Sequence, residues 1–424
     1  MAVGRRSTRR RGQGDVLGGG GSLVKRSITD LALFGGPSAF LHPLYVGKPT
    51  VGDRARFFAR LDWALDNNWL TNGGPLAREL EDRIADLAGV KHCIATCNAT
   101  IALELVLRAS GVTGQVIMPS LTFAATPHSA SWLGLEPVFC DVDPETGSID
   151  PDLAASLITP ETGAIIGVHL WGRAAPVDAL AKVAAEHDVK LFYDAAHALG
   201  CTAGGQPIGG FGAAEVFSFH ATKTVMAFEG GAVVTDDSVL ADRIRVMHNF
   251  GIERDKTISS IGTNGKMSEA AAAMGLTSLD AFPATRERNR ANYSLYRAEL
   301  HGIPGISLIT FDENEENNYQ YVIMQVDQAL TGLSRDRLQE ILRAEKVLAQ
   351  PYFSPACHQL KPYRTDPPLR LPHTERLSGR VLALPTGPSV SFEDIRRVCS
   401  VIRLCASHGE QVNALWDRQG SVTA

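Results

Sequence analysis

Two charged residues in the middle of the chain stand where an amine and a carboxylate would be useful in catalysis. Asp194 ends the apolar run that begins at Leu191, and Lys223 follows 29 positions later, just past a second apolar run. A carboxylate at the end of a buried strand is costly unless a cation or hydrogen bonds stabilise it. A lysine in a loop of small residues can be desolvated, which lowers its pKa and leaves a nucleophilic amine that reacts with aldehydes.

Other predicted strand ends carry residues that suit a flat ring with a phosphate group. Asn98 is a good helix N-cap, so the backbone N–H groups of Ala99 and Thr100 would form an anion site at a helix start. Phe123 follows a strand end and can stack on a ring. His197 comes three residues after Asp194 and is close enough to reach an oxygen substituent on that ring.

Taken singly, each of these features has a more common structural explanation. Helix starts with asparagine are usually just capped, strand-end phenylalanines usually lie in the core, and a lysine in a turn is usually solvated. Together, with Ser218 placed to donate to a phosphate, they predict a site for pyridoxal 5'-phosphate (PLP). Asp194 would keep the pyridine nitrogen protonated, which makes the ring an electron sink, and Lys223 would bond to the aldehyde.

The surrounding elements are those of an α/β protein. Short apolar runs alternate with helical patterns such as Pro75–Gly89, Thr100–Ser110 and Pro176–His187. This alternation predicts a seven-stranded, mostly parallel sheet with helices on both faces. Its strands are expected at His92–Thr96, Gln115–Pro119, Glu136–Val142, Ala164–Leu170, Lys190–Asp194, Ala214–Phe219 and Gly231–Thr235. The last two leave no room for a helix between them, so we expect that pair to be antiparallel or to be linked without a crossover.

After about residue 285 the pattern becomes that of a smaller C-terminal α+β domain. It predicts helices at Arg286–His301, Arg335–Glu345 and Phe392–Ser407, and a strand at Tyr319–Val326. The expected organisation is a disordered basic and glycine-rich tail (1–27), an N-terminal arm (28–60), a large cofactor-binding domain (61–285) and a small domain (286–424). Active sites of open α/β sheets lie at the carboxyl ends of the strands, where the residues above are found.

Composition excludes several other classes of protein. The net charge of −5 provides no positive field for nucleic acid. No apolar run reaches the ~18 residues of a membrane span, and no signal peptide follows the arginine-rich start. The seven cysteines are scattered, with no spacing typical of a metal site or a disulfide framework. These features predict a cytoplasmic enzyme with reduced thiols and no metal.

The combined motifs resemble the DegT/DnrJ/StrS-type sugar-nucleotide aminotransferases over about residues 30–405. That resemblance implies a fold-type-I PLP homodimer with Lys223 as the Schiff-base lysine and Asp194 opposite the pyridine nitrogen. It also implies cofactor contacts from Ala99, Thr100, Phe123, His197, Ser218 and, from the neighbouring subunit, Asn249. Asn264 and Lys266 lie in a stretch that resembles the family's substrate-facing segment.

Two departures from the family pattern are visible. His197 stands where glutamine is more common, and Asn98-Ala99-Thr100 replaces a Ser-Gly-Thr sequence. Both changes keep the necessary donors, because histidine still carries an N–H and Ala99 still offers its backbone N–H.

Further stretches, such as Trp69–Pro75 and Val168–Arg173, are similar to those of the TDP-4-keto-6-deoxyglucose 4-aminotransferases. The resemblance implies transfer of an amino group from L-glutamate to the C4 ketone of a nucleotide sugar. A 3-aminotransferase would share every catalytic residue and stays an alternative. A sugar 3-dehydrase is disfavoured, because related dehydrases have histidine at the position of Lys223.

Overall fold

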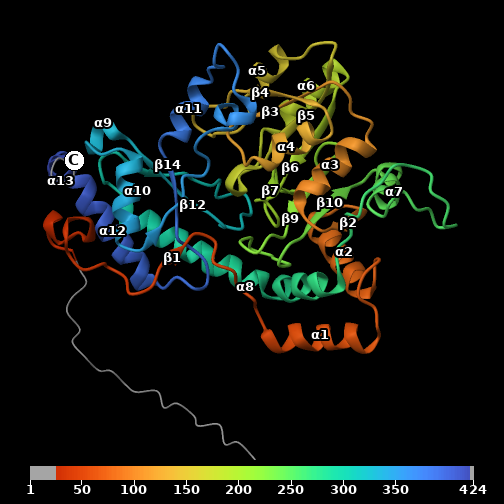
Figure 1. Cartoon of the computed structure of the whole chain (residues 1–424), viewed down its shortest axis with the longest axis horizontal. Coiled ribbons are helices and arrows are strands. Elements are labelled where there is room, and N and C mark those ends of the chain that lie inside the picture. Colours follow the sequence, from red (N-terminus) through yellow and green to blue (C-terminus); the bar gives the residue numbers. More distant parts are fainter. Residues whose placement is uncertain (1–24, 421–424) are drawn as a thin grey trace, which may run out of the picture.

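The computed structural model describes residues 25–420, which form two lobes joined by one long helix (Figure 1). Most of the predicted basic tail lies outside the described residues. Its last residues are included, and Lys25 among them is buried and forms an ion pair with Glu345 at 3.2 Å.

The large lobe is built on a seven-stranded sheet, as predicted. Every neighbouring pair of strands is parallel except the two that involve β10, which runs antiparallel to both its neighbours. The predicted antiparallel pairing of the last two strands is therefore confirmed. In spatial order the strands are β2 (His92–Thr96), β10 (Gly231–Thr235), β9 (Ala214–Ser218), β6 (Lys190–Asp194), β5 (Thr162–Val168), β3 (Gln115–Pro119) and β4 (Glu136–Cys140).

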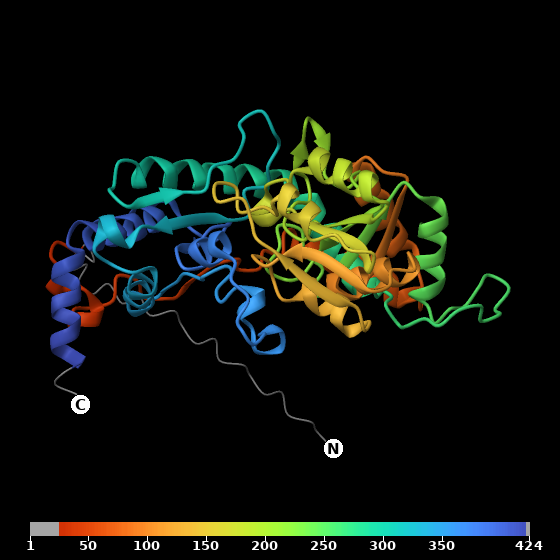
Figure 2. The ribbon, with the colours of Figure 1, turned by 90° about the horizontal axis from the view of Figure 1, so that it is seen from above.

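Helices cover both faces of this sheet (Figure 2). Alternate residues of one strand point to opposite faces, so Val116 and Ile117 of β3 belong to different hydrophobic clusters, as do Ile165 and Ile166 of β5. The large-lobe helices are α1 (Arg54–Asp66), α2 (Pro75–Ala88), α3 (Ala99–Ala109), α4 (Ala125–Trp132), α5 (Pro151–Ser156), α6 (Val177–His187) and α7 (Ser238–Met247). A small hairpin, β7 (Thr202–Ala203) with β8 (Gln206–Pro207), follows β6.

The small lobe has its own hydrophobic core around a three-stranded antiparallel sheet. The sheet order is β11 (Ile306–Leu308), β12 (Val322–Val326) and β14 (Val381–Leu384). A second sheet pairs β1 (Leu44–Tyr45) with β13 (Val347–Leu348), which ties the N-terminal arm to this lobe. The helices are α9 (Gln328–Thr331), α10 (Arg335–Ala344), α11 (Pro372–Ser378), α12 (Phe392–Ser407) and α13 (Gly409–Gly420).

Short 3-10 turns complete the chain. They lie at Ile28–Asp30, Ala32–Phe34, Leu170–Gly172, Cys357–Gln359 and Lys361–Tyr363.

The long helix α8 corrects one prediction. The pattern placed a helix at Arg286–His301, whereas α8 runs from Glu269 to Leu300. Its first half is buried on almost every side, so it lacks the amphipathic periodicity that marks a surface helix, and Pro283 inside it is an unfavourable signal. The predicted domain boundary at 285/286 therefore falls within α8 and the one at 60/61 within α1, and the division into domains stays a prediction.

Other predicted elements differ only at their ends. The predicted strands at Glu136, Ala164 and Ala214 end two, two and one residues earlier than expected, at Cys140, Val168 and Ser218. The strand expected from Tyr319 begins at Val322. Helix α2 starts with Pro75 and is closed by Gly89 in the left-handed conformation, and this closing glycine is one of the signals from which the helix was predicted.

Two observations concern the classes of protein that composition excluded. Within residues 25–420, no helix is both long and apolar enough to cross a membrane. All seven cysteines are free, and all but Cys97 are buried.

Candidate active site

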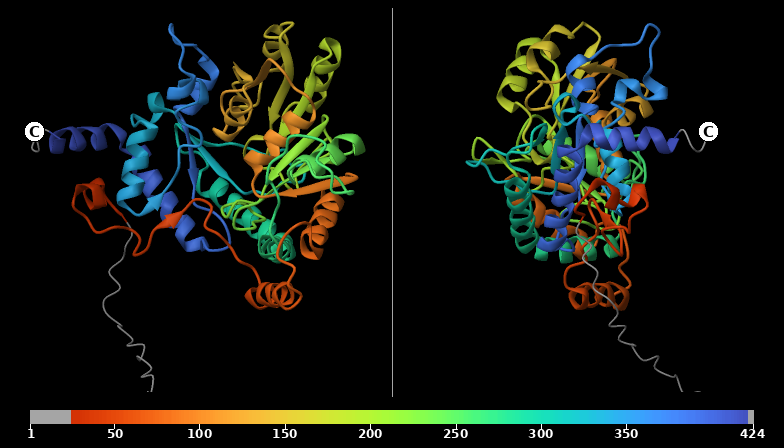
Figure 3. Two further views of the ribbon diagram at one scale, coloured as in Figure 1. Left: turned by 45° about the vertical axis from the view of Figure 1, so that its right-hand side comes forward. Right: turned by 90° about the vertical axis from the view of Figure 1, so that its left-hand side faces the viewer.

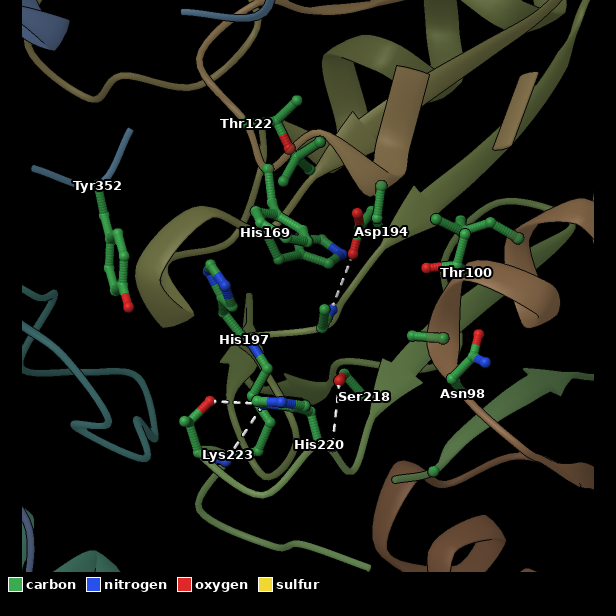
Figure 4. A pocket seen from close by; sticks show the side chains of 18 of the residues that line it. Asn98, Thr100, Thr122, His169, Asp194, His197, Ser218, His220, Lys223 and Tyr352 are labelled. Carbon is green, nitrogen blue, oxygen red and sulfur yellow. Dashed lines mark hydrogen bonds between the residues drawn. The ribbon is translucent and has the colours of Figure 1, made fainter. Parts of the chain in front are cut away.

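A cavity of about 560 Å³ opens at the carboxyl ends of the parallel strands, on the side of the large lobe that faces the small lobe (Figure 4). Its wall includes seven of the eight residues predicted to contact the cofactor. These are Ala99, Thr100, Phe123, Asp194, His197, Ser218 and Lys223. The sequence therefore predicted where the cavity lies and seven of its 22 lining residues, whose roles stay predictions.

Asp194 ends β6 and is only 6% exposed. One carboxylate oxygen accepts a hydrogen bond from the Thr126 hydroxyl at 2.7 Å, and the other accepts one from the Ala196 N–H at 3.1 Å. Thr126 is itself hydrogen-bonded to the hydroxyl of Thr122 at 2.9 Å. Asp194 makes no ion pair with the residues that the structure describes, so a buried carboxylate with two hydrogen bonds remains available to a cationic N–H group in the cavity.

Lys223 lies in the loop between β9 and β10, the two strands that no helix connects. Its Nζ is 3.4 Å from the Tyr321 hydroxyl, and no carboxylate of the described chain forms an ion pair with it. Burial lowers the pKa of Lys223 to about 8, and the attraction of Asp194 opposes this shift. At neutral pH about a tenth of the amine is therefore uncharged, against a very small fraction for an exposed lysine.

His197 is a neutral imidazole with a defined tautomer. Its Nδ1 accepts a hydrogen bond from the Trp171 N–H at 3.2 Å, so the proton must be on Nε2. Burial, and secondarily the charge of Lys223, place the pKa of His197 well below its usual value. The ring packs against Tyr321 and Phe353, with centroids 4.7 and 6.0 Å apart.

The start of α3 forms one end of the cavity. Asn98 is its N-cap and accepts a hydrogen bond from the Ile101 N–H at 2.9 Å, as expected from the sequence. The first N–H groups of a helix have no partner within it, so those of Ala99 and Thr100 can bind an anion. Gly231 of β10 passes close by, since a Cβ there would lie 2.6 Å from the nitrogen of Ala99. This close approach, with Ser218 nearby, makes a cradle that fits a phosphate group.

Phe123 presents an exposed aromatic ring at the cavity. It is 59% exposed and its centroid lies 5.9 Å from that of Phe353. An aromatic face that the chain itself leaves largely uncovered is suited to stacking against a flat ligand.

The remaining predicted residues lie together but outside the cavity wall. Asn249 accepts a hydrogen bond from Lys266 Nζ at 2.7 Å and forms a β-bridge with Asn264. Lys266 also lies over the ring of Phe250, at 4.6 Å from its centroid. Asn249 is expected to serve the neighbouring subunit's site, so its position in a single chain leaves that role a prediction.

Several residues of the cavity wall were given no role in the site from the sequence. Tyr321, Tyr352 and Phe353 come from the small lobe, more than 90 positions from the strand ends, and no local spacing connects them with the site. His169 directly follows β5 and could have been found by the strand-end argument used for Asp194. Its Nε2 is 3.0 Å from the fully buried carboxylate of Glu215, and its Nδ1 accepts from the Ala175 N–H at 2.9 Å.

The described residues contain no cluster of three or more histidine, cysteine or acidic side chains able to hold a metal. The cavity offers an amine with a lowered pKa, a buried carboxylate, a neutral histidine donor, an aromatic face and an anion cradle. These groups match the aldehyde, pyridine nitrogen, ring oxygen, ring face and phosphate of PLP.

Comparison with known proteins agrees with this geometry. The model of the DegT/DnrJ/EryC1/StrS aminotransferase family matches residues 52–403. The dTDP-4-amino-4,6-dideoxy-D-glucose transaminase of Escherichia coli is 34% identical over 363 residues, which cover 84% of this chain and 97% of that protein.

Solved structures show the same likeness. DesI, determined in the presence of its TDP-sugar product, is 58% identical with a TM-score of 0.89, over 92% of this chain and 99% of that one. The sugar aminotransferase CalS13 from Micromonospora echinospora is 26% identical with a TM-score of 0.78, over 85% and 99% of the two chains. The chain therefore belongs to the DegT/DnrJ/EryC1/StrS aminotransferase family and, like its relatives, is a PLP-dependent transaminase.

Proposed function

We propose that this enzyme transfers the amino group of L-glutamate to the C4 ketone of TDP-4-keto-6-deoxy-D-glucose, which gives TDP-4-amino-4,6-dideoxy-D-glucose. The observation that carries the proposal is the meeting of Lys223 and Asp194 in one cavity of about 560 Å³, next to an anion cradle. The sugar and its position are supported by the names of the E. coli relative and of DesI with its TDP-sugar product.

The wall residues divide into those that hold the cofactor and one that moves protons. Ala99, Thr100 and Ser218 would hold the phosphate, and Phe123 would cover one face of the ring. Asp194 would accept the hydrogen bond of the ring N–H, and His197 would donate from Nε2 to the ring oxygen. When bound, PLP stores the amino group between the two half-reactions and withdraws electrons from the carbon that loses a proton.

Lys223 has two roles in this scheme. At rest its Nζ would hold the cofactor through the aldehyde carbon. When free, the same amine would take a proton from one carbon and return it to another. A base with a pKa of about 8 can both accept and give up a proton near neutral pH. The same steps in reverse deliver the amino group to the sugar ketone.

We further propose that the working form is a homodimer. Phe58, Trp63 and Leu65 on α1, and Trp69 and Leu70 just after it, are large apolar side chains that are all at least 40% exposed. Helix α1 lies at the edge of the molecule, beside α8 (Figure 3). Clustered exposure of this kind is typical of an interface, and dimerisation would bring Asn249 of one subunit to the phosphate of the other.

We also place the enzyme in the cytoplasm. The seven free cysteines are typical of a reducing compartment.

Incubation of the purified protein with PLP, L-glutamate and TDP-4-keto-6-deoxy-D-glucose tests the proposed reaction. We expect a product whose mass shows a ketone replaced by an amine, with NMR couplings that place the nitrogen at C4, and an equal amount of 2-oxoglutarate. The proposal would be overturned if this 4-keto sugar were not aminated while a 3-keto sugar nucleotide was. Loss of the C3 hydroxyl without amination would also overturn it.

A further inference from the structure

The segment Asn317–Tyr321, which leads into β12, joins the small lobe to two loops of the active site. Four of its residues, Asn317, Asn318, Gln320 and Tyr321, are polar yet at most 7% exposed. Polar side chains buried to this degree need partners. Their partners lie on the loops that carry His197 and Lys223 and, for Asn317, in the Leu170–Gly172 turn that contacts His197. The cofactor scheme above gives none of the four a role.

The asparagines hold the His197 loop. Asn318 Nδ2 donates to the carbonyl oxygens of His197 and Leu199, at 2.9 and 3.1 Å. Asn317 Nδ2 donates to the carbonyl of Gly172 at 2.6 Å. Gly172 follows Trp171, whose N–H donates to His197 Nδ1. The two asparagines therefore fix both the backbone of His197 and the turn that decides its tautomer.

The next two polar residues hold the Lys223 loop. Gln320 Oε1 accepts hydrogen bonds from the N–H and the hydroxyl of Thr224, at 3.1 and 3.0 Å. The Tyr321 hydroxyl lies 3.4 Å from Lys223 Nζ. Burial keeps the phenol neutral by raising its pKa, so its oxygen is available to accept from the ammonium.

The segment is also shaped by its own side chains. Asn317 Oδ1 accepts from the Tyr319 N–H at 2.7 Å, and Asn318 Oδ1 accepts from the Gln320 N–H at 3.0 Å. These bonds support Tyr319 in a left-handed backbone conformation with φ of 48°. Each asparagine thus accepts a hydrogen bond from the segment's own backbone and donates one to a carbonyl of the active-site loops. The conformation of the segment and its contacts with these loops therefore depend on each other.

We propose that Asn317–Tyr321 is a positioning segment that sets where Lys223 Nζ and His197 Nε2 stand relative to the cofactor. This inference rests on the proposed roles of Lys223 and His197. It assigns the small lobe a part in the chemistry, because the lobe supplies the contacts that fix two groups belonging to the large lobe.

The lysine half of the proposal is tested with Tyr321→Phe, which removes one hydroxyl and keeps the ring. Tyr319→Phe is the matched control, since the Tyr319 hydroxyl has no hydrogen bond to any described residue and its ring packs on the small-lobe core, near the rings of Tyr293 and Phe311. The full-length protein is freed of cofactor, and the rate of covalent PLP capture is measured against pH. Loss of an acceptor for the ammonium should lower the midpoint of the profile by roughly 0.5–1 pH unit in Tyr321→Phe and leave it unchanged in Tyr319→Phe.

The histidine half is tested with Asn318→Ala, and with Asn314→Ala as its control because Asn314 is an exposed residue of the same loop whose amide contacts only Asp312. Misplacing a reacting group lowers turnover more than binding, so kcat should fall roughly tenfold or more in Asn318→Ala while KM changes little. The visible circular dichroism of bound PLP should change in Asn318→Ala alone.

The outcomes separate this inference from the proposed function. If Tyr321→Phe and Asn318→Ala fold and behave like their controls while the wild type captures PLP on Lys223, the positioning segment is wrong and the proposed function stands. If the wild type captures no PLP on Lys223, the proposed function itself fails.

Discussion

At Asp194 a buried negative charge is only partly satisfied by the chain, with one hydrogen bond from Thr126 and one from the Ala196 N–H. Asp194→Asn keeps the size of the side chain and one acceptor oxygen but removes the charge that would hold a proton on the pyridine nitrogen. We expect kcat to fall by roughly 100-fold or more, with the fold intact. Asp188→Asn, at an exposed helix end where asparagine is well tolerated, serves as the control. Turnover of Asp194→Asn within threefold of the wild type would mean that Asp194 does not face the ring nitrogen.

The buried amine of Lys223 lowers the free energy of unfolding by an amount that depends on pH. Its pKa is about 8 in the folded protein and that of an ordinary lysine, 10.5, when unfolded. The unfolded chain therefore binds more protons between these values, so the penalty is complete below pH 8 and disappears as pH rises toward 10.5. Lys223→Met should stabilise the cofactor-free protein at pH 7 by about 1–3 kcal/mol, and this gain should vanish above pH 10.5.

Urea unfolding at several pH values measures this difference, with Lys182→Met at an exposed site as control. A gain that does not depend on pH would show that the effect comes from packing rather than from the buried charge.

The residues found from the sequence share one property: each stands at a strand end or helix start that the local pattern reveals. Asp194 and Phe123 were placed in this way. Tyr321 was not, because it reaches Lys223 from a different lobe, 98 positions along the chain. The roles of all the site residues stay predictions, and Asn249, Asn264 and Lys266 also lie outside the cavity wall of the single chain.

At the scale of helices and strands, the close contact of β10 with the start of α3 determines how much room is left for the phosphate. Gly231→Ala would place a Cβ 2.6 Å from the nitrogen of Ala99, closer than real contacts allow. The first turn of α3 must then move, and we expect PLP affinity to fall at least about tenfold. Gly210→Ala is the control, because its Cβ would meet only Val90 at 3.9 Å. Equal PLP affinity of the two variants, in titrations of the cofactor-free protein, would contradict this account of the cradle.

Helices and strands were predicted best where the apolar residues follow a regular pattern along the sequence. All seven strands of the large sheet were located, because apolar runs of about five residues bounded by turns are typical of buried parallel strands. The first half of α8 was missed because Ala272–Leu279 is buried on all sides and so has no polar face to reveal a helical period. Its path from one lobe to the other became visible only in three dimensions.

At the scale of the whole molecule, the site is completed by both lobes and, in our proposal, by a second subunit. Mixing two inactive variants tests the last point. Lys223→Ala and Asn249→Ala are combined and allowed to exchange subunits. Each mixed dimer has one site with Lys223 from one subunit and Asn249 from the other, so about a quarter of wild-type activity should return.

Ultracentrifugation and a tagged subunit establish that dimers form and exchange. A fully active monomer, or no recovery despite proven exchange and a damaging Asn249→Ala change, would argue against shared sites.

The central claim is that Lys223 holds the cofactor, and it can be tested on the resting enzyme. Protein purified with PLP is reduced with borohydride, digested, and examined by peptide mass spectrometry. The account predicts one PLP per chain, on the peptide that contains Lys223, together with loss of the cofactor's absorbance near ~420 nm. Attachment to any other lysine, or full transaminase activity with no covalent PLP at Lys223, would contradict it.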